Sequence, residues 1–334
     1  MKVITVKAAN VVEIEEKPVP KPGPEEFLVK NVVSGVSSGT ELSLYKGTHE
    51  GFKTGRYKYP MGIGYMCAGE VVEAGNKVEN VKVGDRVAST MPHAEYALLN
   101  NKSLFVKLPE GISYDDAVFI TNATTAVNCL HRTAPTLGDT VAVMGQGLLG
   151  MLALQCAKTA GCKTIAIDPI EQRLNIAKEV GADFVLNPMD TDFKEKLSAA
   201  NDGKKIDIVI EASGNANALK QGLGIVKTQG KLVILARHHN ILPFNILGED
   251  FFMKELNVIS SSVWGPWIEE STDYLKWTYK ENYKLAANLI FQKKIITKPM
   301  ITHNFPYSNI KEVYELVEKQ GDKVLQVILN WRSK

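Results

Sequence analysis

Cysteine is scarce in this chain, whose 334 residues include only Cys67, Cys129, Cys156 and Cys162. No two of them form a C-x-x-C pair, and none lies near a spaced pair of histidines. This pattern excludes a disulfide framework and a structural zinc site made of four cysteines. It is typical of the reduced thiols of a cytoplasmic protein.

A strong excess of charge is also missing, because 39 lysines and arginines stand against 37 aspartates and glutamates. The near-neutral balance argues against nucleic-acid binding, which needs a basic surface. No apolar run reaches the roughly 18 residues of a membrane span. The first seven residues are typical of a strand and lack the apolar region of a signal peptide. We therefore expect a globular protein of two domains, with no nucleic-acid or membrane partner.

The pattern of apolar residues changes along the chain. Residues 1 to about 110 alternate short apolar runs with clusters of Pro and Gly, which is typical of a small β-barrel or sandwich. From about residue 140, apolar runs alternate with helical segments, which indicates strands buried on both faces of a parallel sheet. These runs are Thr140–Met144, Lys163–Ile167, Asp183–Leu186, Ile206–Glu211, Lys231–Ala236 and Leu256–Ser260.

Strands that alternate with helices favour an α/β fold with a doubly wound sheet. Helices are predicted at Leu148–Thr159 and Glu171–Val180, each followed by a glycine that ends it. Further on, we predict helices at Ile268–Gln292 and Ile310–Gln320 and a strand at Lys323–Trp331. We expect this tail to pack on the β-rich module, so that residues 1–124 and 264–334 form one domain and residues 125–263 another.

The segment 145–150, G-Q-G-L-L-G, fits the G-x-G-x-x-G pattern between a strand and a helix. Gly145 permits the tight turn, Gly147 lets the backbone approach a pyrophosphate, and Gly150 allows close packing of helix and strand. The helix start, with Leu148 and Leu149, offers free N–H groups to the phosphates. A glycine-rich turn without a ligand is the alternative.

Asp168 ends the second predicted strand, 23 positions after Gly145. An acid at this place accepts hydrogen bonds from the adenosine ribose and repels a 2′-phosphate, so we expect NAD rather than NADP. Arg173 and Ser213 are the other expected cofactor-binding residues in this part of the chain. A helix N-cap is a second role for Asp168, compatible with the first.

The whole chain resembles the medium-chain dehydrogenase/reductase family, in which a nucleotide-binding domain interrupts a GroES-like catalytic module. Residues 69–75 and 83–87 resemble the family's G-x-V-x-x-x-G and G-D-R-V segments, and residues 93–96 resemble its F-A-E-Y strand. The resemblance implies a GroES-like β-rich domain and a six-stranded Rossmann sheet. Through the segment Asn245–Ser260 it also implies a homodimer or homotetramer.

The chain departs from the zinc-dependent branch of that family at each ligand position. Ser38 stands in place of a cysteine, Tyr65 in place of a histidine, and Thr121 near the place of the third ligand. Hydroxyls are poor zinc ligands, so we expect no metal. The chain is similar in this to a zinc-less subgroup with bacteriochlorophyllide dehydrogenases and sugar- or polyol-type dehydrogenases. The alternative is a hidden zinc site that uses Cys67, His49 or His93.

Without a metal, a side chain must take the proton of an alcohol as hydride leaves for the nicotinamide. We expect His93 to be this general base, because imidazole titrates near neutral pH; a histidine that caps a strand is the alternative. The resemblance implies that Thr40 relays the proton beside Glu41 and that Thr125 packs on the nicotinamide. Ser38, Tyr65 and Asn122 are further candidates at the catalytic site. Local structural roles are the alternatives for Thr40, Glu41 and Tyr65.

Two further groups of residues bear on the substrate. Aromatic side chains, which either stack on sugars or build a core, gather at Trp264, Trp267, Tyr274, Trp277, Tyr279 and Tyr283. His238, His239 and Asn240 follow the fifth predicted strand, where they either line the nicotinamide end or cap a surface loop.

These features together predict a metal-independent, NAD-dependent dehydrogenase that acts on a secondary alcohol of a sugar, polyol or cyclitol. A quinone or enone reductase is the alternative among enzymes, although such reductases usually prefer NADPH. A catalytically inactive nucleotide-binding protein is the alternative outside enzymes.

Overall fold

The computed structural model describes residues 1–239, 241–262 and 277–332, so Asn240, Trp264, Trp267 and Tyr274 lie outside the described residues. The chain divides into two compact units: unit 1 is Met1–Thr121 with Met300–Lys334, and unit 2 is Asn122–Pro299. Unit 2 is thus inserted into unit 1. These boundaries differ from the expected ones, since residues 122–124 and 277–299 belong to unit 2.

The sheet of unit 2 has six parallel strands in the order β11-β10-β9-β12-β13-β14. This order confirms the doubly wound fold. Each strand lies on one of the six predicted runs, and β13 begins five residues earlier than its run. The strands are β9 (Thr140–Met144), β10 (Lys163–Ile167), β11 (Phe184–Leu186), β12 (Ile206–Glu211), β13 (Val226–Ile234) and β14 (Asn257–Ser260).

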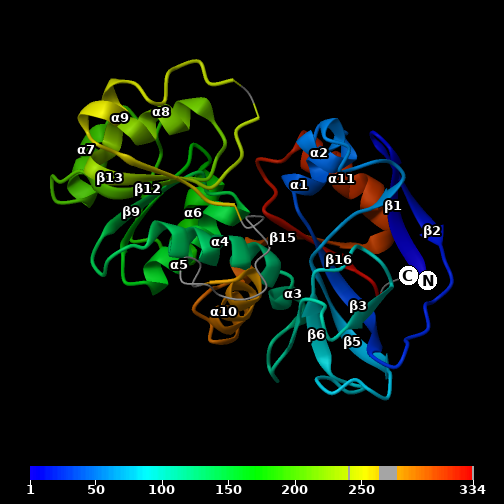
Figure 1. Cartoon of the computed structure of the whole chain (residues 1–334). Coiled ribbons are helices and arrows are strands. Elements are labelled where there is room, and N and C mark those ends of the chain that lie inside the picture. Colours follow the sequence, from blue (N-terminus) through cyan, green and yellow to red (C-terminus); the bar gives the residue numbers. More distant parts are fainter. Residues whose placement is uncertain (240, 263–276, 333–334) are drawn as a thin grey trace. The chain divides into compact units, whose positions relative to one another are not determined.

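Helices cover both faces of this sheet, with α7, α8 and α9 on one face and α5 and α10 on the other (Figure 1). Apolar side chains of α7 and α8 pack against the sheet in one buried cluster. The helices are α4 (Ile120–Thr133), which starts in unit 1, α5 (Leu148–Thr159), α6 (Glu171–Glu179), α7 (Phe193–Ala200), α8 (Ala216–Ile225), α9 (Glu249–Met253) and α10 (Tyr279–Phe291).

The start of α10 corrects the predicted helix Ile268–Gln292. Thr278 accepts a hydrogen bond from the Glu281 backbone, and the Glu281 carboxylate accepts one from the Thr278 backbone. This reciprocal pair is a capping box, which begins a helix after the threonine. The helix therefore begins at Tyr279, and Trp277 and Thr278 precede it.

Unit 1 contains two sheets. One has three strands in the order β2-β1-β4, and the other has seven, in the order β15-β16-β3-β5-β6-β8 with β7 also paired to β3. The strands are β1 (Lys2–Ala8), β2 (Val11–Glu16), β3 (Glu26–Val36), β4 (Met61–Gly62), β5 (Cys67–Ala74), β6 (Arg86–Ser89), β7 (Tyr96–Asn100), β8 (Phe105–Lys107), β15 (Ile301–Pro306) and β16 (Gln326–Asn330).

The C-terminal segment belongs to unit 1 because β16 pairs antiparallel with β3. The helices of this unit are α1 (Thr40–Tyr45), α2 (Glu50–Lys53), α3 (Tyr114–Ala117) and α11 (Ile310–Lys319), with a 3₁₀ turn at Tyr307–Asn309. A second 3₁₀ turn, Lys298–Met300, spans the boundary with unit 2. The buried face of α11 carries Ile310, Val313, Tyr314 and Val317, spaced three and four residues apart. In the described part of the chain, no helix is long and apolar enough to span a bilayer.

Candidate active site

The glycine-rich turn of unit 2 joins β9 to α5, as predicted. Gly145 has a φ of +93°, a conformation that favours glycine, and a Cβ on Gly150 would lie 1.9 Å from the Gly145 carbonyl oxygen. A Cβ on Gly147 would meet nothing within 4 Å. Gly147 also precedes Leu148, where α5 begins and its first N–H groups lack helical partners. The turn therefore leaves open backbone at the place suited to an anion.

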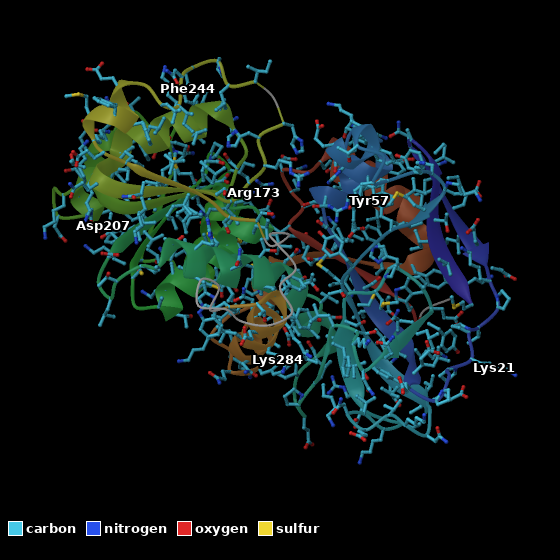
Figure 2. The ribbon with its side chains drawn as sticks, viewed as in Figure 1. Lys21, Tyr57, Arg173, Asp207, Phe244 and Lys284 are labelled. Carbon is cyan, nitrogen blue, oxygen red and sulfur yellow. The ribbon has the colours of Figure 1, made fainter. Side chains whose placement is uncertain are left out.

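Asp168 fixes this turn from the neighbouring strand. Its carboxylate is buried and accepts hydrogen bonds from the backbone N–H of Gln146 at 2.7 Å and of Ile170 at 2.8 Å. The Arg173 guanidinium lies 3.9 Å from the same carboxylate. Arg173, which is labelled in Figure 2, belongs to α6. The two predicted cofactor residues are thus held beside the turn. Asp168 does not cap α6, whose N-cap position is Ile170.

Ser213, the last predicted cofactor residue on this edge of the sheet, is exposed just after β12. Its backbone comes within 2.8 Å of the position of a Cβ on Gly145, so its loop lies against the glycine turn. Glu211 organises that loop, and its carboxylate is completely buried. The carboxylate accepts hydrogen bonds from the Ser213 and Gly214 backbone and from the Ser213 hydroxyl.

Glu41 is the centre of a buried polar network in unit 1. It lies in the first turn of α1 and is 0% exposed. Its carboxylate accepts a hydrogen bond from the Ser37 backbone at 2.9 Å, while its own N–H donates to the Ser37 carbonyl at 3.2 Å. The side chain therefore holds the turn from Ser37 to Thr40 in place.

His93 is the second member of this network and is also 0% exposed. Its backbone is bonded on both sides, to Ile63 at 2.8 Å and to Ile4 at 3.0 Å. Its ring packs against Gly64, where a Cβ would come within 2.5 Å of the imidazole. Nδ1 lies 2.8 Å from the Ser34 hydroxyl and Nε2 lies 2.9 Å from Glu41 Oε2. Both ring nitrogens are occupied, so neither accepts a substrate proton in this arrangement.

The directions of these hydrogen bonds follow from the Glu41 carboxylate, which only accepts, and from the Trp331 indole N–H, which only donates. Trp331 donates to Ser34 Oγ at 2.8 Å, and Ser34 donates its own hydrogen to Nδ1 of His93, because a single ring proton on Nε2 leaves Nδ1 as an acceptor. Nε2 of His93 then carries the ring proton and donates to the Glu41 carboxylate. This assignment gives Trp331, Ser34, both ring nitrogens of His93 and the Glu41 carboxylate a hydrogen-bond partner each.

Tyr314 completes the network from α11. Its hydroxyl donates to Glu41 Oε2 at 3.3 Å, and its ring stacks on Tyr45 with centroids 4.6 Å apart. Burial raises the pKa of Tyr314, as do the Glu41 charge and, more weakly, the nearby Tyr65. The hydroxyl therefore stays protonated and remains a donor. Tyr65 itself is half-buried, and its carbonyl accepts a hydrogen bond from Thr121 at 3.3 Å.

The other predicted residues of the catalytic site have different surroundings. Thr40 is exposed as the first residue of α1, and Ser38 is half-buried two residues before it. The hydroxyl of Thr40 takes no part in the Glu41–His93 network. Asn122 and Thr125 lie in the first two turns of α4, the former buried and the latter half-buried.

The described donor groups of unit 1 are not arranged as a set of zinc ligands. Among the described residues, no three of His, Cys, Asp and Glu gather as a metal would need. The alternative ligands are committed elsewhere: Cys67 Sγ lies 3.0 Å from the Met91 carbonyl oxygen, and His49 Nδ1 accepts from the Gly51 backbone. Burial, with the Glu41 charge, also raises the pKa of the Cys67 thiol, which opposes the thiolate that zinc requires.

Three members of the network were not predicted from the sequence, namely Ser34, Tyr314 and Trp331. Tyr314 and Trp331 lie 273 and 297 positions from Glu41 and Ser34, their partners. The spacing of Tyr314 with Ile310, Val313 and Val317 indicates a buried helix face, but it does not indicate a polar partner.

Comparison with known proteins places this architecture in a family. Residues 23–153 match the alcohol dehydrogenase GroES-like domain, and residues 149–279 match the zinc-binding dehydrogenase domain. The L-threonine 3-dehydrogenase of Pyrococcus furiosus is 30% identical over 91% of both chains. The sorbitol dehydrogenase of Bacillus subtilis is 28% identical over 98% of this chain and 97% of that one.

Among solved structures, an alcohol dehydrogenase of Escherichia coli CFT073 in complex with NADH superposes with a TM-score of 0.81. It is 26% identical and covers 99% of both chains. The inserted six-stranded sheet, the two matched domains and the full-length relatives agree with one another. The chain belongs to the medium-chain dehydrogenase/reductase superfamily.

Proposed function

We propose that this protein is an NAD-dependent dehydrogenase that oxidises a secondary alcohol of a polyol, sugar or cyclitol without a metal. The observation that carries the cofactor part is Asp168, a buried carboxylate bonded to the backbone of the glycine turn. In sheets of this type, an acid at the end of the second strand pairs with ribose hydroxyls. A 2′-phosphate at the same place would meet its negative charge.

The proposal that no metal takes part rests on the donor set. Ser38, Tyr65 and Thr121 present hydroxyls at the ligand positions of the zinc-dependent branch, and His93 is bonded to Ser34 and Glu41. Imidazole, thiolate and carboxylate are the groups that hold zinc in proteins. The chain therefore has to move the proton of the alcohol with its own side chains.

Thr40 is the group that we assign to this proton transfer. Oxidation of the alcohol moves a hydride from carbon to the nicotinamide and a proton from oxygen to the Thr40 hydroxyl. Thr40 gives its own proton to water at the same time, which its exposed position allows. His93 and Glu41 are positioning residues in this scheme, because their network fixes the turn from Ser37 to Thr40.

The relatives support the proposed substrate class. They are named for L-threonine acted on at position 3 and for sorbitol. Both molecules carry secondary alcohols beside other polar groups. A small polyhydroxylated or amino alcohol is therefore the first class to test.

The test is a panel of polyols, sugars, cyclitols and threonine, assayed for NADH and NADPH formation with the purified protein and its zinc content measured. We expect NADH formation with one of these alcohols and zinc well below one atom per chain. Stoichiometric zinc would overturn the metal-free mechanism. Reduction of quinones or enones with NADPH would favour a reductase instead. Tight NAD binding without turnover of any alcohol would favour an inactive nucleotide-binding protein.

Thr40 is tested in the same assay. Thr40→Val should lower kcat by roughly 10²- to 10⁴-fold, the usual contribution of a positioned proton-transfer group. Thr40→Ser keeps the hydroxyl and should retain most of the turnover. Wild-type turnover in Thr40→Val would remove Thr40 from the reaction.

We also propose that the protein forms a homodimer through β14, the edge strand of the unit 2 sheet. Val258 on this strand is 36% exposed, and Phe252 and Met253 on neighbouring α9 are 76% and 68% exposed. An apolar surface beside an open strand edge is suited to pairing with a second copy. Light scattering should give twice the chain mass, and Val258→Asp should shift it to the monomer. A wild-type monomer would contradict the proposal.

A further inference from the structure

Glu211 and His238 form a second buried acid–histidine pair, in unit 2. Nε2 of His238 lies 2.9 Å from Glu211 Oε2, and the His238 side chain is 13% exposed. Glu211 Oε1 accepts from the backbone of Ser213 at 2.8 Å and of Gly214 at 3.0 Å. A carboxylate surrounded by donors in this way is an acceptor only, so the shared proton belongs to His238 Nε2.

The proton on Nε2 of His238 decides whether the other ring nitrogen, Nδ1, donates or accepts a hydrogen bond. In neutral imidazole, a proton on Nε2 leaves a lone pair on Nδ1. Among the described residues, His238 has no hydrogen-bond partner besides Glu211. Glu211 thus holds the ring in one orientation and makes Nδ1 an acceptor for an outside donor.

The position of the pair follows from the strand order. Glu211 ends β12, which adjoins β9 and its glycine turn, and His238 follows β13, the next strand. Their loops are packed side by side: the Ser213 backbone abuts Gly145, and a Cβ on Gly214 would lie 3.0 Å from the Arg237 carbonyl oxygen. A continuous edge therefore runs from the glycine turn to His238.

A dinucleotide bound at the glycine turn extends in two directions along this edge. Asp168 on the β10 side occupies the adenosine direction, which leaves the β12 and β13 side for the other nucleoside. We propose that His238, oriented by Glu211, accepts a hydrogen bond from the nicotinamide nucleoside, through a ribose hydroxyl or the carboxamide. This assignment rests on the proposed NAD-dependent function and adds two residues to it.

Calorimetric titration of the full-length protein at pH 8 with NADH, ADP-ribose and ADP tests the assignment. His238→Ala should weaken NADH binding roughly fivefold to tenfold, the value of one hydrogen bond, and leave ADP within twofold. Equal weakening of ADP-ribose would identify a ribose hydroxyl as the donor, whereas unchanged ADP-ribose binding would identify the carboxamide. The exposed neighbour provides the matched control, and His239→Ala should bind all three like the wild type.

The Glu211→Gln variant tests whether Glu211 orients the His238 ring or only packs against it. Its amide oxygen can still accept from the Ser213 loop, while its NH₂ faces Nε2 and drives the ring proton to Nδ1. ¹⁵N-histidine NMR should show His238 protonated on Nε2 in the wild type and on Nδ1 in the variant. NADH affinity should fall to that of His238→Ala. The double variant Glu211→Gln/His238→Ala should bind NADH no more weakly than His238→Ala alone. His238→Asn keeps an acceptor near the Nδ1 position and should restore part of the affinity.

Each outcome of these titrations decides the matter. NADH affinity within twofold in His238→Ala, or unchanged in Glu211→Gln, would overturn the assignment. Equal weakening of ADP would also overturn it, because ADP lacks the nicotinamide nucleoside. A wild-type protein that binds neither NADH nor ADP would instead reject the proposed function itself.

Discussion

The candidate site of unit 2 consists mainly of backbone groups, whereas that of unit 1 consists of side chains. In unit 2 the glycine turn offers backbone, and Asp168 supports it through main-chain N–H groups. In unit 1 the site depends on side chains that meet from distant segments, as Ser34, Glu41, His93, Tyr314 and Trp331 do. One site is encoded locally by residue spacing, and the other is complete only when the tail has returned to the β-rich module.

The two sites tolerate different kinds of substitution. A backbone site depends on the absence of side chains, so the addition of a single methyl group damages it. A buried side-chain network depends on complete pairing, so the loss of one member leaves the others without partners in a medium of low polarity. Substitutions of opposite kinds therefore distinguish the two sites.

The largest effect is expected at the centre of the unit 1 network. His93→Ala leaves the buried Glu41 carboxylate without its histidine partner, and breaking such a pair destabilises a protein by ~3–5 kcal/mol. Urea unfolding followed by circular dichroism measures the loss. The double variant His93→Phe/Glu41→Met removes both polar groups and should recover much of the stability. A loss below ~1 kcal/mol in His93→Ala would show that the pair is not a structural unit.

The next effect tests the backbone site. Gly150→Ala forces a Cβ to within 1.9 Å of the Gly145 carbonyl oxygen and should cost ~1–3 kcal/mol by overpacking. Gly147→Ala meets no atom within 4 Å and should unfold like the wild type, yet bind NADH at least tenfold more weakly if the turn holds the pyrophosphate. Gly224→Ala, in open space on α8, is the control for a glycine in a helix. Wild-type NADH affinity in Gly147→Ala would exclude the turn as the phosphate site.

The contrast between the sites also explains how far the sequence alone leads. Six apolar runs and their glycine stops predict the sheet of unit 2, because burial on both faces and helix termination depend on neighbouring residues. The turn and Asp168 follow from a fixed spacing for the same reason. The return of the tail is also visible in its change of pattern, although the second boundary lies at residue 300 rather than 264.

The unit 1 network could not be predicted in the same way. His93 was recognised as a titratable group, but its burial and its two partners depend on contacts 52 and 59 positions away. Its expected role as a direct base stays a prediction, and the occupied nitrogens favour a positioning role. Trp331 directly follows β16, the last strand in the described part of the chain, where the apolar pattern indicates only a core residue. No local spacing encodes a hydrogen bond that joins the two ends of the chain.

A smaller loss of stability is expected from substitutions of two tyrosines that stack on each other in unit 1. Tyr314 donates to the Glu41 carboxylate, whereas Tyr45 donates to the Asn10 carbonyl oxygen at 3.0 Å. Tyr314→Phe should cost ~1–2 kcal/mol, because the acceptor is charged, and Tyr45→Phe about half as much. Urea unfolding of the two matched variants gives the difference. An equal or smaller loss in Tyr314→Phe would mean that Glu41 does not depend on this hydroxyl.

The last effect appears only at high pH and comes from the four buried thiols, one in unit 1 and three in unit 2. Burial raises the pKa of Cys129 and Cys156 to about 12 and that of Cys162 to about 11, from an ordinary value of 9.0. The folded chain keeps these thiols protonated, while the unfolded chain ionises them near pH 9. Their contribution to stability is therefore complete below pH 9 and is lost as the pH rises towards 11 to 12.

Labelling of the thiols would also test which unit unfolds first. At pH 8 the folded protein should resist iodoacetamide at all four cysteines, because thiolate is the reactive form and each side chain is buried. If the units unfold independently, peptide mapping should show that Cys67 is labelled at a different urea concentration from the three cysteines of unit 2. Simultaneous labelling of all four would mean that the units unfold as one. The long-range network of unit 1 is complete only when the tail has returned, so we expect Cys67 to be labelled first.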